Sequence, residues 1–154
     1  GSGALGANTI GTGNVAVGKG AGGAITTGAD NVCIGLSAGD ALTTGVDNIA
    51  IGSDALSVCT IGTDNIAIGG DAGAALTTGI DNVAIGGDAL DACTIGTDNI
   101  AIGKGALGAV ITGINNVAIG GGAGIVGSAS TRSTNLPTTG QADATADARS
   151  VMAL

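Results

Sequence analysis

The chain has 154 residues, including 32 Gly and no Phe, Tyr, Trp or His. Its formal net charge is −8, and all 12 acidic residues are Asp. Nucleic-acid binding requires basic groups against phosphates and flat rings for base stacking, so the composition excludes that class. The usual groups of acid–base, zinc and triad catalysis are also missing, so we expect no enzyme and no cofactor.

The N-terminal residues already follow a repeating pattern. Gly1, Ala4, Leu5, Thr9 and Ile10 occupy the same positions as their counterparts in later repeats. The chain therefore opens in the middle of a repeat and without Met, which favours a processed product or a part of a longer molecule.

The dominant pattern is an Asn that recurs every 17 residues, followed by a branched aliphatic, a small residue, a branched aliphatic and Gly. The Asn residues are Asn14, Asn31, Asn48, Asn65, Asn82, Asn99 and Asn116. Segments 43–76 and 77–110 are more alike than adjacent single repeats, which indicates duplication of a 34-residue pair. A strict period of this kind predicts stacked structural units.

The segment after each Asn predicts a short strand, because its side chains alternate between branched and small. We expect the branched residues, such as Val32 and Ile34 or Ile66 and Ile68, to stack inward as core ladders. The small residues would then form the opposite face, which suits close approach by another chain and is the candidate oligomer interface. These residues are Ala50, Ala67, Ala84, Ala101 and Ala118.

The second half of each repeat, A-x-x-x-[LC]-T, predicts another short strand with Leu42, Leu76 and Val110 inward. Two columns of Gly mark the corners and imply backbone angles that a Cβ would forbid. One column is Gly18, Gly35, Gly52, Gly69, Gly86, Gly103 and Gly120; the other is Gly11, Gly28, Gly45, Gly62, Gly79, Gly96 and Gly113. The predicted fold is all-β, a parallel β-roll or β-solenoid of about seven and a half 17-residue repeats over residues 1–127.

The D-N-[IV]-A-I-G-x-x-A-L pattern resembles the head repeats of trimeric autotransporter adhesins of the YadA type. It is also similar to T-T-G-x-[DN]-N-x-A-I-G-x-x-A-L repeats of bacteriophage tail fibres. The resemblance covers residues 1 to about 127 and implies a left-handed roll, three chains around a threefold axis, and an extracellular location on a virion or a cell. The adhesin repeat is typically 14 residues rather than 17, and the resemblance carries over no catalytic residue.

Two glycine motifs and one sorting-type motif are explained by the repeat and by composition. Residues 1–6 and 103–108 each fit G-x-G-x-x-G, but neither lies in the strand–helix unit that dinucleotide binding requires. Residues 136–140 spell L-P-T-T-G, but polar and acidic residues follow instead of a membrane segment. We interpret this match as a coincidence. No run of about 18 apolar residues occurs, so we expect no membrane insertion.

Two columns of Asp leave two interpretations open. One column is Asp30, Asp47, Asp64, Asp81 and Asp98; the other is Asp54, Asp71 and Asp88. Stacked carboxylates repel one another unless a cation or amide donors compensate, so calcium could bridge the first column. The simpler interpretation is an Asp-Asn turn, with the Asn amides hydrogen-bonded from one repeat to the next.

Threonines and cysteines also fall in columns. Thr26, Thr43, Thr60, Thr77 and Thr94 could form a flat ladder of the kind that ice-binding solenoids use, although Thr is also a common strand residue. Cys59 and Cys93 lie two repeats apart, too far for a disulfide, and replace Leu in the predicted core. Cys33 replaces Ala.

The period ends after Gly127. Residues 128–140 are predicted to be a Ser/Thr/Pro linker. Residues 141–154 are rich in Ala and are predicted to form a helical or a disordered tail.

The function predicted from these features is structural: a rigid homotrimeric shaft of a phage tail fibre or another virion appendage that displays a receptor-binding tip. The mean hydropathy of +0.53 favours burial against other copies of the chain. Other fibre, virion or cell-surface proteins are the expected partners. The alternatives are the adhesive head of a bacterial surface adhesin, a self-assembling extracellular filament and an ice-binding solenoid.

Overall fold

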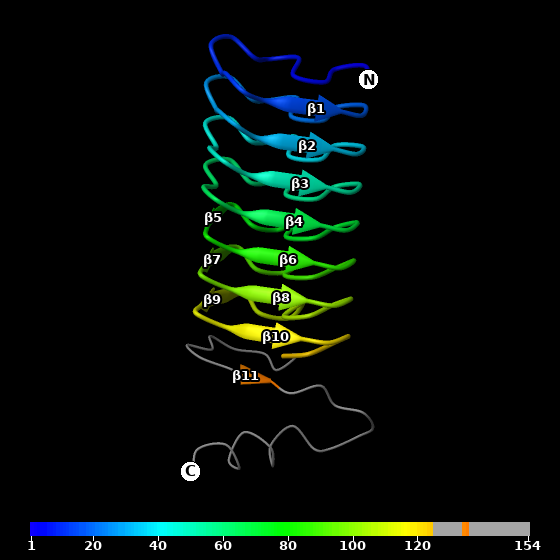
Figure 1. The fold of residues 1–154 in the computed structure, drawn as a ribbon, viewed down its shortest axis with the longest axis vertical. Helices are drawn as coiled ribbons and strands as arrows, with labels where there is room; N and C mark the ends of the chain where they lie inside the picture. Colours follow the sequence, from blue (N-terminus) through cyan, green and yellow to red (C-terminus); the bar gives the residue numbers. More distant parts are fainter. Residues whose placement is uncertain (125–133, 136–154) are drawn as a thin grey trace.

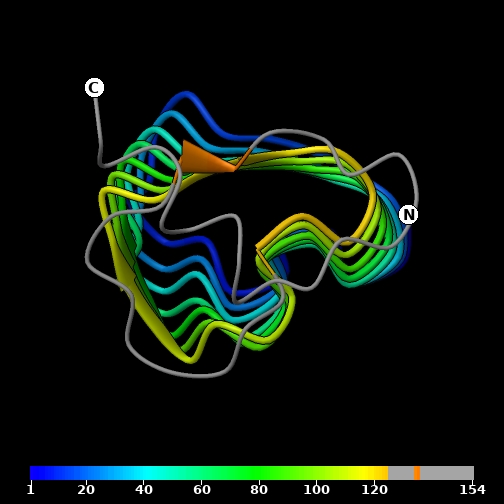
Figure 2. The same cartoon turned by 90° about the horizontal axis from the view of Figure 1, so that it is seen from below.

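The protein is a parallel β-solenoid with a 17-residue period, seen in a computed structural model that describes residues 1–124 and 134–135 (Figure 1). The labelled strands of the large sheet cross the near side from left to right, and the chain returns behind them as it descends. The view along the axis in Figure 2 agrees, so the coil winds left-handed. The predicted fold class is confirmed.

The large sheet contains one short parallel strand from each coil. Its strands, in spatial order, are β1 (Val15–Val17), β2 (Val32–Ile34), β3 (Ile49–Ile51), β4 (Ile66–Ile68), β6 (Val83–Ile85), β8 (Ile100–Ile102), β10 (Val117–Ile119) and β11 (Thr134–Asn135). Each residue pairs with the residue 17 positions later, as in Val32 with Ile49. The described residues form no helix, and thus none that is long and apolar enough to cross a membrane.

The second sheet lies on the return path of the chain. It contains β5 (Thr78–Ile80), β7 (Ile95–Thr97) and β9 (Thr112–Ile114), and isolated bridges continue it backwards through Thr63 and Val46 to Ala29. Its residues come slightly after the A-x-x-x-[LC]-T segment that was predicted to be the second strand. That segment forms turns instead, although Leu42, Leu76 and Val110 are buried as predicted.

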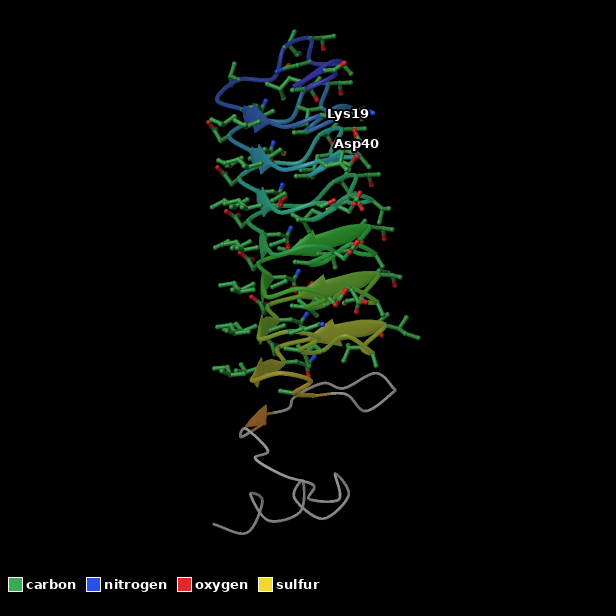
Figure 3. All side chains as sticks on the ribbon, turned by 90° about the vertical axis from the view of Figure 1, so that its right-hand side faces the viewer. Lys19 and Asp40 are labelled. Carbon is green, nitrogen blue, oxygen red and sulfur yellow. The ribbon has the colours of Figure 1, made fainter. Side chains whose placement is uncertain are left out.

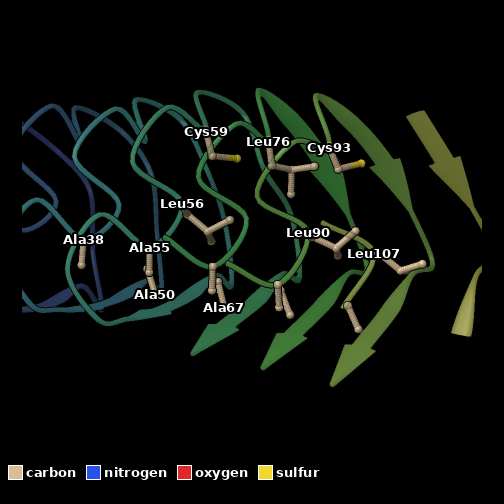
Figure 4. Packing of buried hydrophobic residues seen from close by; sticks show 14 of the residues in the cluster. Ala38, Ala50, Ala55, Leu56, Cys59, Ala67, Leu76, Leu90, Cys93 and Leu107 are labelled. Carbon is tan, nitrogen blue, oxygen red and sulfur yellow. The ribbon is translucent and has the colours of Figure 1, made fainter. Parts of the chain in front are cut away.

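The core is a set of parallel columns inside the coil (Figure 4). One column contains Ile25, Leu42, Cys59, Leu76, Cys93 and Val110, and another contains Leu56, Leu90 and Leu107. The Ala residues at the centres of the large-sheet strands, such as Ala50 and Ala67, are buried on the other side of the Leu56 column from Cys59 and Leu76. Each buried side chain thus packs on its counterparts above and below as well as across the coil.

The predicted orientation of the large-sheet strands is wrong. Ala50, Ala67, Ala84, Ala101 and Ala118 are at most 3% exposed, so they face the interior and cannot form an interface with another chain. The branched residues on either side of them face outward: Ile34, Ile68 and Ile100 are 36–37% exposed. A coil of 17 residues encloses little space, and the Leu and Cys columns already occupy it, so only small side chains fit on the inner face of the strand.

Cys33 shows how tightly the interior is matched. It replaces Ala in the inward column of the strands. The adjacent positions in the column of Leu56, Leu90 and Leu107 are occupied by Gly22 and Gly39. A Cβ added to Gly39 would lie 2.6 Å from the Cys33 Sγ, and one added to Gly22 would lie 3.6 Å from it. The larger thiol therefore occupies space that the smaller glycines leave.

A ladder of buried Asn side chains connects the coils. From Asn31 to Asn116, each Nδ2 donates to the Oδ1 of the preceding Asn at 2.8–3.0 Å, and each backbone N–H donates to the same oxygen at 3.0–3.2 Å. The Nδ2 groups from Asn14 to Asn99 also donate to the carbonyl of the Gly 14 residues later, at 2.7–2.8 Å. The predicted bonding of Asn amides from repeat to repeat is confirmed.

The two Gly columns serve different purposes. The column that follows the large-sheet strands has φ between 126° and 139°, as at Gly86 and Gly18, which an L side chain rarely adopts. The column that precedes Asn has no such angle but faces the Asn ladder. At Gly62, an added Cβ would lie 2.9 Å from the Asn65 Nδ2 and 2.5 Å from the Cys59 Sγ. Close approach, and not backbone angle, excludes other residues there.

The predicted linker contains one described element. β11 pairs with β10 in the 17-residue register, Val117 with Thr134 and Ala118 with Asn135, so the pairing extends beyond the predicted boundary at residue 127. The remainder of the predicted linker (128–140), with its L-P-T-T-G motif, and the predicted tail (141–154) lie outside the described residues.

We predict that Asn65→Ala lowers the free energy of unfolding by about 3 kcal/mol or more, because it removes several bonds and leaves buried donors of Asn82 without their acceptor. Thermal denaturation followed by far-ultraviolet circular dichroism measures the loss. The matched control is Asp64→Asn, since Asn115 occupies the same exposed corner in another coil. Equal stability of Asn65→Ala and the wild type would contradict the role of the ladder.

Candidate interaction surfaces

The Asp columns are explained by backbone conformation. Asp30, Asp47, Asp64, Asp81 and Asp98 have φ of 55–56°, and Asp54, Asp71 and Asp88 have φ of 56–58°. The other described residues in these two columns are Gly, Ser or Asn. Apart from Ser, these are the types that most readily adopt left-handed angles, since Asp and Asn can bond locally. Within residues 1–124, no group of three or more Asp or Cys side chains is placed to hold a metal ion.

Asp91 has two like-charged neighbours, Asp88 and Asp71. Burial raises the pKa of Asp91, and the charges of these neighbours raise it further. Its Oδ1 is buried and has no hydrogen-bond partner among the described residues. Burial and like charge therefore both act against the ionised form of this carboxyl group.

The predicted Thr column has a structural role. The hydroxyls of Thr26, Thr43, Thr60, Thr77 and Thr94 each donate to the carbonyl of the corresponding residue in the next coil, at 2.8–3.3 Å. These hydroxyl hydrogens already bond within the protein. The G-x-G-x-x-G segments 1–6 and 103–108 lie at turns of the coil, and neither precedes a helix.

The three thiols are free and buried, as expected of small core residues. Burial raises the pKa of Cys33 from its ordinary value of 9.0 to about 11, and it also raises the pKa values of Cys59 and Cys93. Protonated, enclosed thiols are poor nucleophiles.

The surface that sequence reasoning missed is the outer side of the large sheet, which we call the aliphatic face. It consists of two adjacent columns of Val and Ile without a polar member. Its residues are Val15, Val17, Val32, Ile34, Ile49, Ile51, Ile66, Ile68, Val83, Ile85, Ile100, Ile102, Val117 and Ile119. A contiguous apolar stripe along all the described coils is unusual for a surface in water, so it is a candidate interaction site. Figure 3 shows side chains projecting in rows from the coils along the rod.

Charged residues lie on both sides of the aliphatic face. The exposed Asp column that includes Asp47 and Asp64 precedes each strand, and the position two residues after each strand is occupied by Lys in two coils, Lys19 and Lys104. Figure 3 shows Lys19 on the same side of the rod as Asp40. The apolar stripe is thus bounded on one edge by the exposed Asp column, while the corner after the strands carries both the two lysines and the acidic column of Asp54, Asp71 and Asp88.

Another surface lies on the second sheet, where Gly points inward and the residues before and after it point outward. We call these outward residues the mixed face: Thr44, Val46, Ile61, Thr63, Thr78, Ile80, Ile95, Thr97, Thr112 and Ile114. Each coil contributes one Thr and one aliphatic residue, and their order alternates from coil to coil.

Comparisons with known proteins add no relative: no family model, curated protein or solved structure matches the chain.

We predict that Ala67→Ile destabilises the fold by about 1–3 kcal/mol, because Ala67 is 1% exposed and a larger side chain overpacks the interior. Chemical denaturation measures the change. Ala75→Val is the control, since Val58 occupies the same column in the preceding coil. A neutral effect of Ala67→Ile would restore the outward orientation of the Ala column.

The raised pKa of Cys33 predicts loss of stability in alkali. The unfolded chain releases this proton near pH 9 and the folded chain near pH 11, so stability falls as the pH rises through that window. The shift of two pKa units corresponds to about 2–3 kcal/mol. Thermal melts between pH 9 and 11 should therefore show a smaller decline for Cys33→Ala than for the wild type. Parallel declines would show that this thiol does not contribute.

Proposed function

We propose that the chain is a structural segment of an extracellular fibre, a stiff shaft in which three copies pack through their aliphatic faces. The observation that supports this most strongly is the aliphatic face itself, 14 branched side chains in two unbroken columns. Each Å² of apolar surface buried between copies would stabilise the assembly by about 25 cal/mol. The number three and the setting, a phage tail fibre or another virion appendage, come from the resemblance of the repeats.

The charges on either side of the aliphatic face are compatible with a closed ring of copies. In a cyclic assembly each chain contacts the next through unlike edges. The Asp edge of one copy would then lie beside the edge of the next copy that carries Lys19 and Lys104. The lysines would offset part of the repulsion there, since Asp54, Asp71 and Asp88 share that edge, and the apolar columns would lie at the centre.

Stiffness supports the role of a shaft. The backbone bonds, the Asn ladder and the Thr hydroxyls all join one coil to the next in the direction of the rod axis. Bending the rod would lengthen several of these bonds at once, so a displayed tip would stay at a fixed distance from its anchor.

Three alternatives give different outcomes in the same experiments. An adhesive head would bind host matrix or cells through the isolated repeats. A filament subunit would assemble end to end through the open edges of its first and last coils, as unpaired strands can. An ice-binding solenoid would act on ice crystals.

The first experiment is native mass by light scattering with refractive-index detection, because the chain has no Trp or Tyr. We expect a mass near three chains for the wild type. Ile68→Lys should reduce it to one chain, since it places an ammonium group within the aliphatic face at a position that is 37% exposed in the single chain.

The control is Val58→Lys, which introduces the same charge on another part of the coil, at a position that is 43% exposed. This variant should keep the mass of three chains. A single-chain wild type would refute the trimer, and a polydisperse species of very high mass would favour the filament.

A further inference from the structure

The mixed face differs from the aliphatic face in the state of its polar groups. The hydroxyls of Thr44, Thr63, Thr78, Thr97 and Thr112 form no hydrogen bond with the protein among the described residues, whereas those of the neighbouring Thr column are bonded to carbonyls. The aliphatic members of the mixed face are exposed: Ile61 and Ile95 are 54% and 56% exposed. Hydroxyl and methyl groups thus both meet the solvent.

These groups form a regular array. Coils stack at about 4.8 Å, and the two outward residues of one strand are about 6.6 Å apart. The end view in Figure 2 shows each coil turned slightly relative to the one before it, so the array continues along the rod with a gradual twist. Thr and aliphatic residues alternate in both directions, as in Thr78 beside Ile80 and Ile95 beside Thr97.

The base of the array is rigid. The inward residue between the two outward ones is Gly in every coil, and its carbonyl accepts the Asn amide at 2.7–2.8 Å. Gly79 and Gly96 also pair directly in the second sheet. The outward groups therefore keep fixed relative positions without a bound partner, which lowers the entropy lost when an ordered partner binds.

The coils present the same groups at regular intervals along the rod. A partner can make the same contact with each coil only if it also repeats along this axis. Three such partners differ in chemistry: a second copy of the chain, a linear polysaccharide and crystalline water. A second copy is disfavoured because the exposed Asp column adjoins this face and the partner would also carry a net charge of −8. Polysaccharide recognition generally uses ring stacking, and the chain has no aromatic residue.

We propose that the mixed face binds ice. Free hydroxyls supply hydrogen bonds to water at a regular spacing, and the methyl groups between them order the adjacent water without competing for it. The face carries no charged side chain that would hold water in another arrangement. The residues involved are those of the mixed face and not the Thr column with bonded hydroxyls. The proposal does not depend on the fibre function, because the mixed and aliphatic faces belong to different sheets.

The test measures the gap between the freezing and melting points of a solution and the shape of ice crystals grown in it. The wild type should open such a gap and give faceted crystals. The double variant Thr78→Lys/Thr97→Lys should lose both effects, because its ammonium groups interrupt the centre of the array. The control Ser53→Lys/Gly87→Lys adds the same charges at another corner and should keep both effects.

Circular dichroism and native mass accompany each measurement, so that loss of folding or of assembly is recognised separately. A folded wild type that leaves ice growth unchanged would overturn the proposal, and so would a Thr78→Lys/Thr97→Lys variant as active as the wild type. Sedimentation with crystalline chitin or cellulose, without any effect on ice, would also overturn it and assign the face to a glycan.

Discussion

The buried Asn ladder is the interaction on which the rest of the structure depends. Each interior Asn donates from its amide to groups of both adjacent coils: an Asn Oδ1 on one side and a Gly carbonyl on the other. Asn48 and Asn82 also donate to a carbonyl two residues earlier. A single coil would leave these groups buried without partners, at a cost of about 1–3 kcal/mol for each. Coils are therefore stable only as a stack, and the stack keeps one register because a displaced coil would lose the whole ladder.

The ladder also determines what surrounds it. The preceding Gly column exists because the Asn amides lie where a Cβ would be, as at Gly62. The adjacent corner has a left-handed conformation, which selects Asp or Asn and so contributes much of the charge of −8. The acidity of the protein is therefore largely a consequence of corner geometry, and it needs no cation to explain it.

The narrow interior leaves large apolar side chains of the strands on the outside of the coil. Ala fills the inner side of the large sheet, and the branched residues that most sequences would bury are left outside, among them Ile34, Ile68 and Ile100. Such a surface is costly in water, which is why assembly with other copies is central to the proposed function. The mixed face replaces half of the apolar residues with Thr and is suited to remain in contact with water or ice.

The sequence by itself determined the period, the parallel stacking, the Asn contacts between repeats and the inward position of residues such as Leu76. The first three follow from spacing alone, because residues 17 apart must be neighbours in a stacked coil, and the inward position of Leu76 follows from its apolar side chain. It did not determine which side of the strand faces inward, since alternation in Ile66–Ile68 separates two faces without saying how much space lies behind each. Only the tertiary structure decided that, through the volume already filled by the Leu and Cys columns. It likewise decided which Thr hydroxyls are free, because their bonds are to carbonyls of the next coil. The sequence carried a partial signal at Cys33, whose larger side chain in the Ala column coincides with Gly22 and Gly39 in the column of Leu56, although Gly73 occupies that column beside Ala67 as well.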